Sequence, residues 1–189
     1  MLRATAAAFV VLGLWPSQAH AAEPSLFEAY KAVCHDTRAD PQKALAALGP
    51  GWSDSPLPQP DPALHQVHKV KQIGPERREL LLVERVLPKG TDQSPFAKRM
   101  RICMLTASSQ ATGLKASVSA LMGAPPNGQP GGATSWTYDD APGGRQFFTG
   151  GTAAETNARI AKGPLVIVIV AETPQGDVAG FTEVRALGE

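Results

Sequence analysis

The residue pair in this sequence that most suggests chemistry is Cys34-His35, because a thiolate beside a base can act as a nucleophile. Neighbouring residues on a helix point about 100° apart, however, so His35 is poorly placed to take a proton from Cys34. The chain has one other cysteine, Cys103, and two cysteines in an exported chain most simply pair with each other. We therefore expect a Cys34–Cys103 disulfide and assign no catalytic residue.

Two further histidines, His65 and His68, have a spacing that can hold a metal ion only if both lie on one face of a helix. On a strand, residues three apart point to opposite faces. We favour a strand here, and no third ligand is evident. The sequence also lacks P-loop, GxGxxG and GxSxG patterns. We predict no metal site and no cofactor, and an enzyme is the less favoured class.

Aromatic residues gather in the second half of the chain beside an irregular Pro/Gly-rich segment, residues 123–132. They alternate on one predicted strand and continue on the next: Trp136, Tyr138, Phe147 and Phe148. One interpretation is core packing. The other is a surface that binds an apolar ligand or a partner protein. The neighbouring pair Asp139-Asp140 could bind a cation weakly or cap a turn.

The N-terminal residues have the pattern of a signal peptide. Arg3 is followed by a short apolar stretch, and Ala19-His20-Ala21 provides the small residues that a signal peptidase recognises. We expect cleavage after Ala21, which leaves residues 22–189 as a single domain in the periplasm or outside the cell. No later apolar run is long enough to span a membrane.

The charge balance argues against nucleic acid as a partner. The 189 residues include 18 basic and 17 acidic side chains, a formal net charge of +1. Arg3 is the only charged residue of the expected signal peptide, so the remaining chain is neutral. A neutral domain has no long-range attraction for polyanions.

Hydrophobic periodicity predicts the elements that position these residues. A helix follows Ser25, which can form a capping box with Glu28, and a second helix follows the N-cap Asp40. Residues 111–122 have the apolar spacing of a third helix. The expected strands are 64–73, 78–87, 99–107, 133–140, 144–150, 164–173 and 177–187.

These elements predict an α+β fold with a mostly antiparallel sheet of about six to seven strands, packed against two to three helices and carrying one disulfide. Residues 164–173 are apolar on both faces and should form a central strand, whereas 177–187 should be more exposed. For residues 152–163 the sequence leaves two alternatives open, a short helix capped by Thr152 and Glu155 or an irregular strand.

The pattern LFEAYKAVC, then DPQKALAALGPGW, then a strand cysteine resembles small exported proteins of unknown function in Gram-negative bacteria. This resemblance implies a fold and a compartment, and it implies no activity and no site residues.

The residues favour a non-enzymatic binding protein for a small apolar ligand or a protein partner of unknown identity. Two alternatives stay open: a hydrolase-like or thiol-dependent enzyme, and a structural component of the cell envelope. The sequence does not indicate the oligomeric state.

Overall fold

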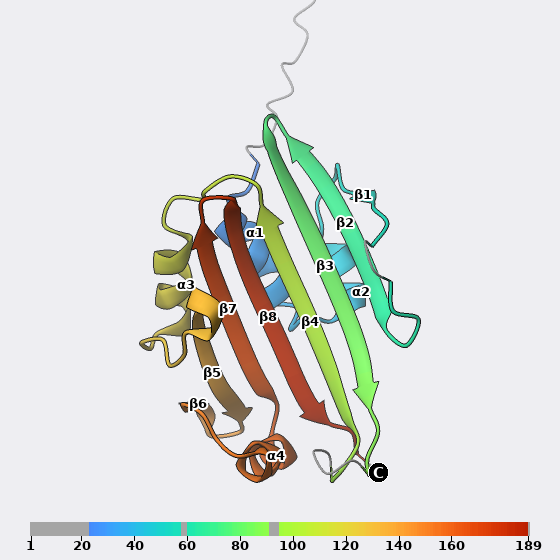
Figure 1. Ribbon diagram of the computed structural model, residues 1–189, viewed down its shortest axis with the longest axis vertical. Helices are drawn as coiled ribbons and strands as arrows, with labels where there is room; N and C mark the ends of the chain where they lie inside the picture. The colour runs from blue at the N-terminus through green and yellow to red at the C-terminus, as the bar shows by residue number, and fades with distance from the viewer. Residues whose placement is uncertain (1–22, 58–59, 91–94, 189) are drawn as a thin grey trace, which may run out of the picture.

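The structure is a computed structural model, and it describes residues 23–57, 60–90 and 95–188. In these residues one antiparallel sheet of eight strands has the order β1-β2-β3-β4-β8-β7-β5-β6 (Figure 1). The predicted signal peptide, residues 1–21, lies outside the described residues. The described part of the chain has no helix long and apolar enough to cross a membrane.

Along β3, β4 and β7, buried positions alternate with partly exposed ones, as expected for a sheet with one covered face. Their bounds are β1 Ser53–Asp54, β2 His65–Ile73, β3 Glu76–Leu87, β4 Lys98–Ala107, β5 Thr134–Ala141, β6 Gly144–Phe147, β7 Leu165–Thr173 and β8 Gly176–Ala186. Short turns join β2 to β3 and β7 to β8, so each of these pairs is a hairpin.

The helical segments begin where the sequence provides caps. They are α1 Leu26–Tyr30, a π-helical turn η1 Lys31–His35, α2 Pro41–Ala47, α3 Leu114–Met122, a 3-10 turn η2 Pro130–Gly132 and α4 Ala153–Lys162. The Ser25 hydroxyl accepts a hydrogen bond from the Glu28 amide at 3.1 Å, and the Glu28 carboxylate accepts one from the Ser25 amide at 2.8 Å. The predicted capping box is therefore present.

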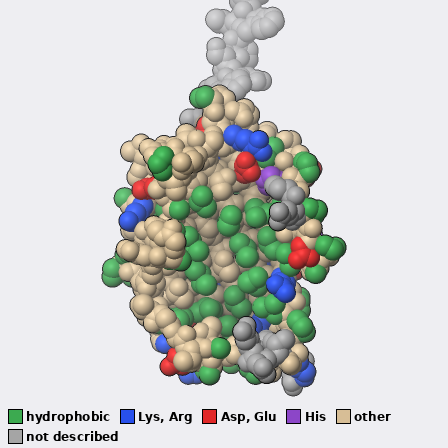
Figure 2. All heavy atoms as spheres, viewed as in Figure 1, with side chains coloured by type: hydrophobic (Ala, Val, Ile, Leu, Met, Phe, Trp, Pro, Cys, Tyr) green, Lys and Arg blue, Asp and Glu red, His purple; other side chains and the backbone are tan. Residues whose placement is uncertain are grey.

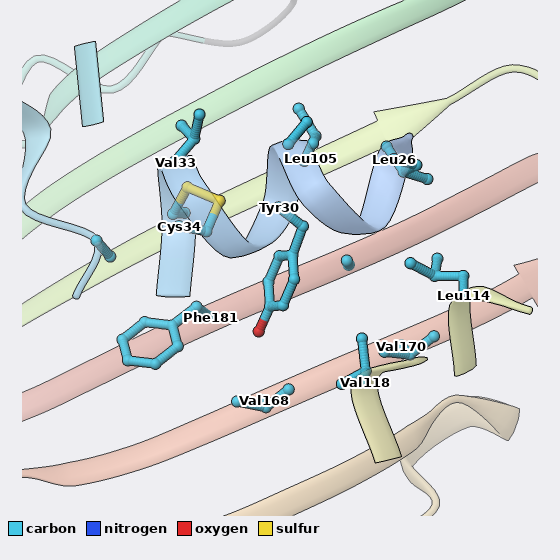
Figure 3. Close-up of a cluster of buried hydrophobic side chains, with 14 of the residues drawn as sticks. Leu26, Tyr30, Val33, Cys34, Leu105, Leu114, Val118, Val168, Val170 and Phe181 are labelled. Atoms are coloured by element: carbon cyan, nitrogen blue, oxygen red, sulfur yellow. A yellow bond between two sulfur atoms is a disulfide. The ribbon is translucent and has the colours of Figure 1, made fainter. Parts of the chain in front are cut away.

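The first three helices cover one face of the sheet. Figure 1 shows α1 and α2 behind the strands, and Figure 3 shows α3 beside them over β7. Helix α4 lies at one end of the sheet, where it bonds to Asp139 of β5 and Lys98 of β4. Both residues alternate with core positions, so they point to the opposite side of the sheet from α1. We call that side the open face.

The disulfide lies at the centre of the core. Cys34 of η1 is bonded to Cys103 of β4, with their Cα atoms 5.3 Å apart, which confirms the predicted pairing. Tyr30 and Phe181 pack around it, as Figure 3 shows, and both side chains are almost fully buried. The bond thus attaches the first helical segment directly to the middle of the sheet.

The predicted α+β fold is confirmed, with slightly more strands and helices than expected. The two-residue strand β1 was not predicted, and the undecided segment 152–163 is helical. The expectation of an exposed final strand is wrong, since β8 lies between β4 and β7. Its polar residues Asp177 and Glu183 are buried, and Glu183 forms ion pairs with Arg38 and Arg185.

Candidate ligand-binding cleft

A cleft of about 640 Å³ lies between the end of the β5–β6 hairpin and α4. Figure 1 shows these elements at the lower end of the sheet. This volume falls in the range of small-molecule sites. The residues that line it come from β5, β6, the segment after β6 and one face of α4: Asp139, Ala141, Gln146, Phe148, Thr149, Gly150, Gly151, Glu155, Thr156, Ala158, Arg159 and Lys162. Most of them carry polar groups, so the cleft is suited to a polar ligand.

Helix α4 supplies the charged wall of the cleft. Thr152 caps its first turn, with the hydroxyl accepting from the Glu155 amide at 3.2 Å and the Glu155 carboxylate accepting from the Thr152 amide at 2.7 Å. Hydrogen bonds from the Thr152 backbone and side chain lower the pKa of Glu155 below its usual 4.5. Glu155, Arg159 and Lys162 follow at i, i+4 and i+7, so they share the face that lines the cleft.

Arg159 of α4 contacts two side chains at the floor of the cleft, Asp139 of β5 and Phe148 of the segment after β6. The Arg159 guanidinium donates to one carboxylate oxygen of Asp139, with Nη1 and Oδ2 2.7 Å apart. Its central carbon lies 4.0 Å from the ring centroid of Phe148, in cation–π geometry. The guanidinium therefore joins an acidic group to an aromatic group at the floor of the cleft.

The second carboxylate oxygen of Asp139, Oδ1, does not take part in the bond to Arg159. Asp139 is only 7% exposed, and its Oδ1 is a buried atom with no hydrogen-bond partner among the described residues. A buried polar atom without a partner costs free energy, commonly about 1–3 kcal/mol. A ligand that donated a hydrogen bond to this oxygen would also remove the cost of leaving it unpaired. Such a bond would therefore contribute more free energy than an ordinary hydrogen bond.

Lys162 provides a positive charge in the cleft that complements the negative charge of Asp139. It is exposed at the end of α4 and has no ion-pair partner among the described residues. The four charged side chains of the cleft are Asp139, Glu155, Arg159 and Lys162, two acidic and two basic. A zwitterionic ligand has no net charge, so its binding would keep the net charge of the cleft at zero.

Two of the four predicted aromatic site residues belong to the core. Trp136 and Tyr138 are 0% and 1% exposed and face the helices. They offer no surface to a ligand in this conformation. Phe147 packs against the core with its ring centroid 5.2 Å from that of Tyr138, and only Phe148 lines the cleft.

The irregular segment after α3 lies against β5 and is held there by hydrogen bonds. The indole of Trp136 donates to the Ala124 carbonyl at 2.9 Å. The Asn127 side chain donates to the carbonyls of Thr137 and Phe148, each at 2.7 Å, and accepts from the Thr137 amide at 2.8 Å. These bonds fix the backbone of Phe148, and so they position one wall of the cleft.

The neighbouring pair Asp139-Asp140 is divided between the two faces of β5. Asp139 faces α4, whereas Asp140 accepts a hydrogen bond from Arg38 on the helical side. The two carboxylates therefore do not form a joint cation site. Among the described residues no group of three or more His, Cys, Asp and Glu side chains lies close enough together to hold a metal ion.

The three histidines of the described residues, His35, His65 and His68, lie outside the cleft. His35 Nδ1 lies 2.8 Å from an Asp36 oxygen, and its ring meets the edge of Phe181. Burial lowers the pKa of His35, against the opposing effect of the Asp36 carboxylate. His65 is exposed, and His68 forms a contact of 3.1 Å with Glu79 on the open face. None of the three lines the cleft.

Comparison with family models, with curated protein sequences and with solved structures finds no match to this chain. The resemblance to small exported bacterial proteins therefore remains an expectation from the sequence.

The residues that sequence reasoning missed are Arg159 and Lys162. The spacing of Glu155, Arg159 and Lys162 places three charges on one face once the segment is known to be helical. That signal was present in the sequence, but it has meaning only on a helix, and the periodicity of 152–163 did not decide between helix and strand.

Proposed function

We propose that this protein is an exported, non-enzymatic binding protein and that the cleft between β6 and α4 takes a small zwitterion, a free amino acid or the end of a short peptide. The observation that carries the proposal is that Asp139, which lines the cleft, has a buried Oδ1 with no hydrogen-bond partner among the described residues, and that Lys162 of the same cleft has no ion-pair partner among them.

The acidic side of the cleft favours an ammonium group. Asp139 uses only Oδ2 for Arg159, and a charge-assisted hydrogen bond to Oδ1 would be about twice as strong as a neutral one. The Arg159 side chain is about one-third exposed, 35%, so it can move off the carboxylate and let a ligand reach that oxygen. An amine of the ligand would then replace part of the pairing that Arg159 provides.

The basic side favours a carboxylate. Lys162 and the displaced Arg159 both present cations to the cleft, and Arg159 offers the flat array of donors that binds a carboxylate through two bonds. Between the two charged sides, Phe148, Ala141 and Ala158 provide apolar surface. An amino acid with an aliphatic side chain has groups for all three regions.

The lining residues also favour binding over catalysis. They include no histidine and no cysteine, so the cleft lacks the usual base for activating the hydroxyls of Thr149 and Thr156. Both cysteines of the chain are joined in the disulfide, which removes the thiol required by a cysteine-dependent enzyme.

Calorimetric titration of the disulfide-bonded protein with three matched ligands tests the proposal. L-Leucine carries both charges, N-acetyl-L-leucine lacks the ammonium, and L-leucinamide lacks the carboxylate. We expect L-leucine to bind, and each of the other two to bind at least about tenfold more weakly, since one charge-assisted bond is lost in each. Equal binding of all three, or no binding of L-leucine, would contradict the proposal.

A further inference from the structure

Asp139 and Phe148 form two sides of a cation subsite in the cleft, and a side chain of the protein itself occupies it. The Arg159 guanidinium donates to Asp139 Oδ2 at 2.7 Å and lies over the Phe148 ring at 4.0 Å from its centroid. Figure 2, viewed from the open face, shows basic and acidic side chains close together at the lower end of the sheet, where Figure 1 places β6 and α4. A carboxylate beside an aromatic face is a combination that binds a guanidinium or an ammonium group.

The Arg159 contact differs from two other contacts between a cation and an aromatic ring. Among the described residues, Arg145 lies 5.1 Å from the Tyr138 ring centroid and Lys98 lies 5.3 Å from that of Phe96. Both distances are longer than that of Arg159, and neither of these cations lines the cleft. Of the three cations, Arg159 is therefore the one that occupies space a ligand would use.

The carboxylate and the aromatic ring of the subsite are held by the sheet. Asp139 lies on β5 between Gln146 of β6 and Leu165 of β7, and its side chain is 10% exposed. The backbone amide of Phe148 donates to the Thr137 carbonyl at 3.1 Å. Neither residue depends on Arg159 for its position, so the subsite keeps its form when the arginine leaves.

Arg159 is the movable part of the subsite. Its helix is anchored, because Asn157 and Ile160 of α4 are 8% and 4% exposed and Lys98 donates a hydrogen bond to Asn157. The Arg159 side chain itself is 35% exposed. It can therefore leave the subsite and return by rotation of the side chain, without movement of α4.

We propose that Arg159 is an internal competitor for this subsite and that it makes the cleft select zwitterions over simple amines. This selectivity rests on the proposed function, because it belongs to the same cleft. An amine without a carboxylate would displace the guanidinium from Asp139 and offer it no ion-pair partner in return. A zwitterion would offer its own carboxylate to the released guanidinium and so replace the lost pairing.

Glu155 is the other carboxylate that a released Arg159 would meet on α4, since it lies four residues earlier on the same helical face. Its Oε2 already accepts hydrogen bonds from the Thr152 amide at 2.7 Å and from the Thr152 hydroxyl at 3.2 Å. The cap fixes the orientation of this carboxylate, whereas a ligand carboxylate can turn to meet the guanidinium with both oxygens. The ligand is therefore the better partner.

Calorimetric titration of the disulfide-bonded wild-type protein and of Arg159→Ala with two small probes tests the proposal. N-Ethylguanidinium carries the cation alone, and N-ethylurea is its uncharged analogue. We expect Arg159→Ala to bind N-ethylguanidinium at least about tenfold more tightly than the wild type, because the tethered competitor is absent. N-Ethylurea should bind to neither protein. Arg159→Gln should act in the same direction, and circular dichroism would show that each variant keeps its fold.

The selectivity itself is measured with L-leucine and L-leucinamide. Arg159→Ala should bind L-leucinamide more tightly than the wild type does, because an amine no longer has to displace a guanidinium. L-Leucine gains in the same way but loses a partner for its carboxylate. The preference for L-leucine over L-leucinamide should therefore fall at least about fivefold in Arg159→Ala.

Two further variants are the controls. Arg145→Ala removes an arginine from an aromatic ring outside the cleft and should leave the affinity for N-ethylguanidinium at the wild-type value. The double variant Asp139→Asn/Arg159→Ala should lose the gain that Arg159→Ala provides. Equal affinity of the wild type and Arg159→Ala for N-ethylguanidinium would overturn the inference, and so would a gain that survives Asp139→Asn. The result with N-ethylguanidinium does not depend on whether L-leucine binds, so the two proposals fail separately.

Discussion

Asp139 and Arg159 form an ion pair of 2.7 Å that satisfies only one of the two carboxylate oxygens. The arginine comes from α4 and the aspartate from β5, so this contact is one of those that join the helix to the sheet, and it forms the floor of the cleft. A pair with an unused acceptor at a cleft is unlike an ordinary surface salt bridge, whose atoms are satisfied by water.

Substitutions of the two charged sides should weaken ligand binding separately. Asp139→Asn removes the charge that would attract an ammonium, and Lys162→Gln removes the charge that would attract a carboxylate. We expect each to raise the Kd for L-leucine about tenfold, measured by calorimetry. Lys115→Gln, an exposed lysine on α3, is the control and should leave the Kd unchanged. An effect of Lys115→Gln as large as that of Lys162→Gln would indicate non-specific electrostatics.

Trp136 should affect stability and not ligand binding. Its ring is fully buried and its indole donates to the Ala124 carbonyl. Trp136→Ala leaves a cavity and should lower the free energy of unfolding by about 3–5 kcal/mol. Trp136→Phe should lower it less, because most of the ring volume remains. Denaturant unfolding measures both, and a stable Trp136→Ala variant that fails to bind L-leucine would place the ring in the binding site.

The fold could be predicted from the sequence because its signals are local. The Ser25 cap, the Asp40-Pro41 start and the alternation along β3 and β4 each specify an element without knowledge of the rest. The disulfide followed from the compartment and from the number of cysteines. These inferences rest on short-range chemistry, and the structure confirms them.

The site could not be predicted in the same way, because it depends on pairings between distant residues. Arg101 lies on the helical side of β4, where it forms ion pairs with Asp40 and Glu84. The sequence does not show these pairings. It does not show either that β8 inserts between β4 and β7. Aromatic residues with strand spacing are typical of a core and of a binding surface alike, and only the folded structure shows that the Trp136 side chain is fully buried.

Removal of the disulfide should cost stability without abolishing the fold. Cys34 and Cys103 close a loop of 69 residues, and closing a loop of that length is worth about 4 kcal/mol by chain entropy. The double variant Cys34→Ala/Cys103→Ala should unfold at correspondingly lower denaturant concentration with a native circular dichroism spectrum. An unchanged midpoint would mean that the bond contributes little to the folded state.

The first turn of α4 should lose its cap in acid. The lowered pKa of Glu155 means that its carboxylate stabilises the folded state above its unfolded pKa of about 4.5 and loses this effect as the pH falls through the folded value. The Tm of the wild-type protein should therefore exceed that of Glu155→Gln at pH 7, and the difference should shrink as the pH falls below about 4.5. A difference that stays constant with pH would show that charge at Glu155 is not responsible.

The central claim is that a zwitterion binds in the cleft between β6 and α4, and an NMR titration of the ¹⁵N-labelled, disulfide-bonded protein with L-leucine tests it most directly. The account predicts saturable shifts in the backbone amides around Asp139, in the segment from Phe148 to Gly151 and along α4 to Lys162. Absence of shifts, or shifts centred on the open face or on the segment 123–132, would contradict it.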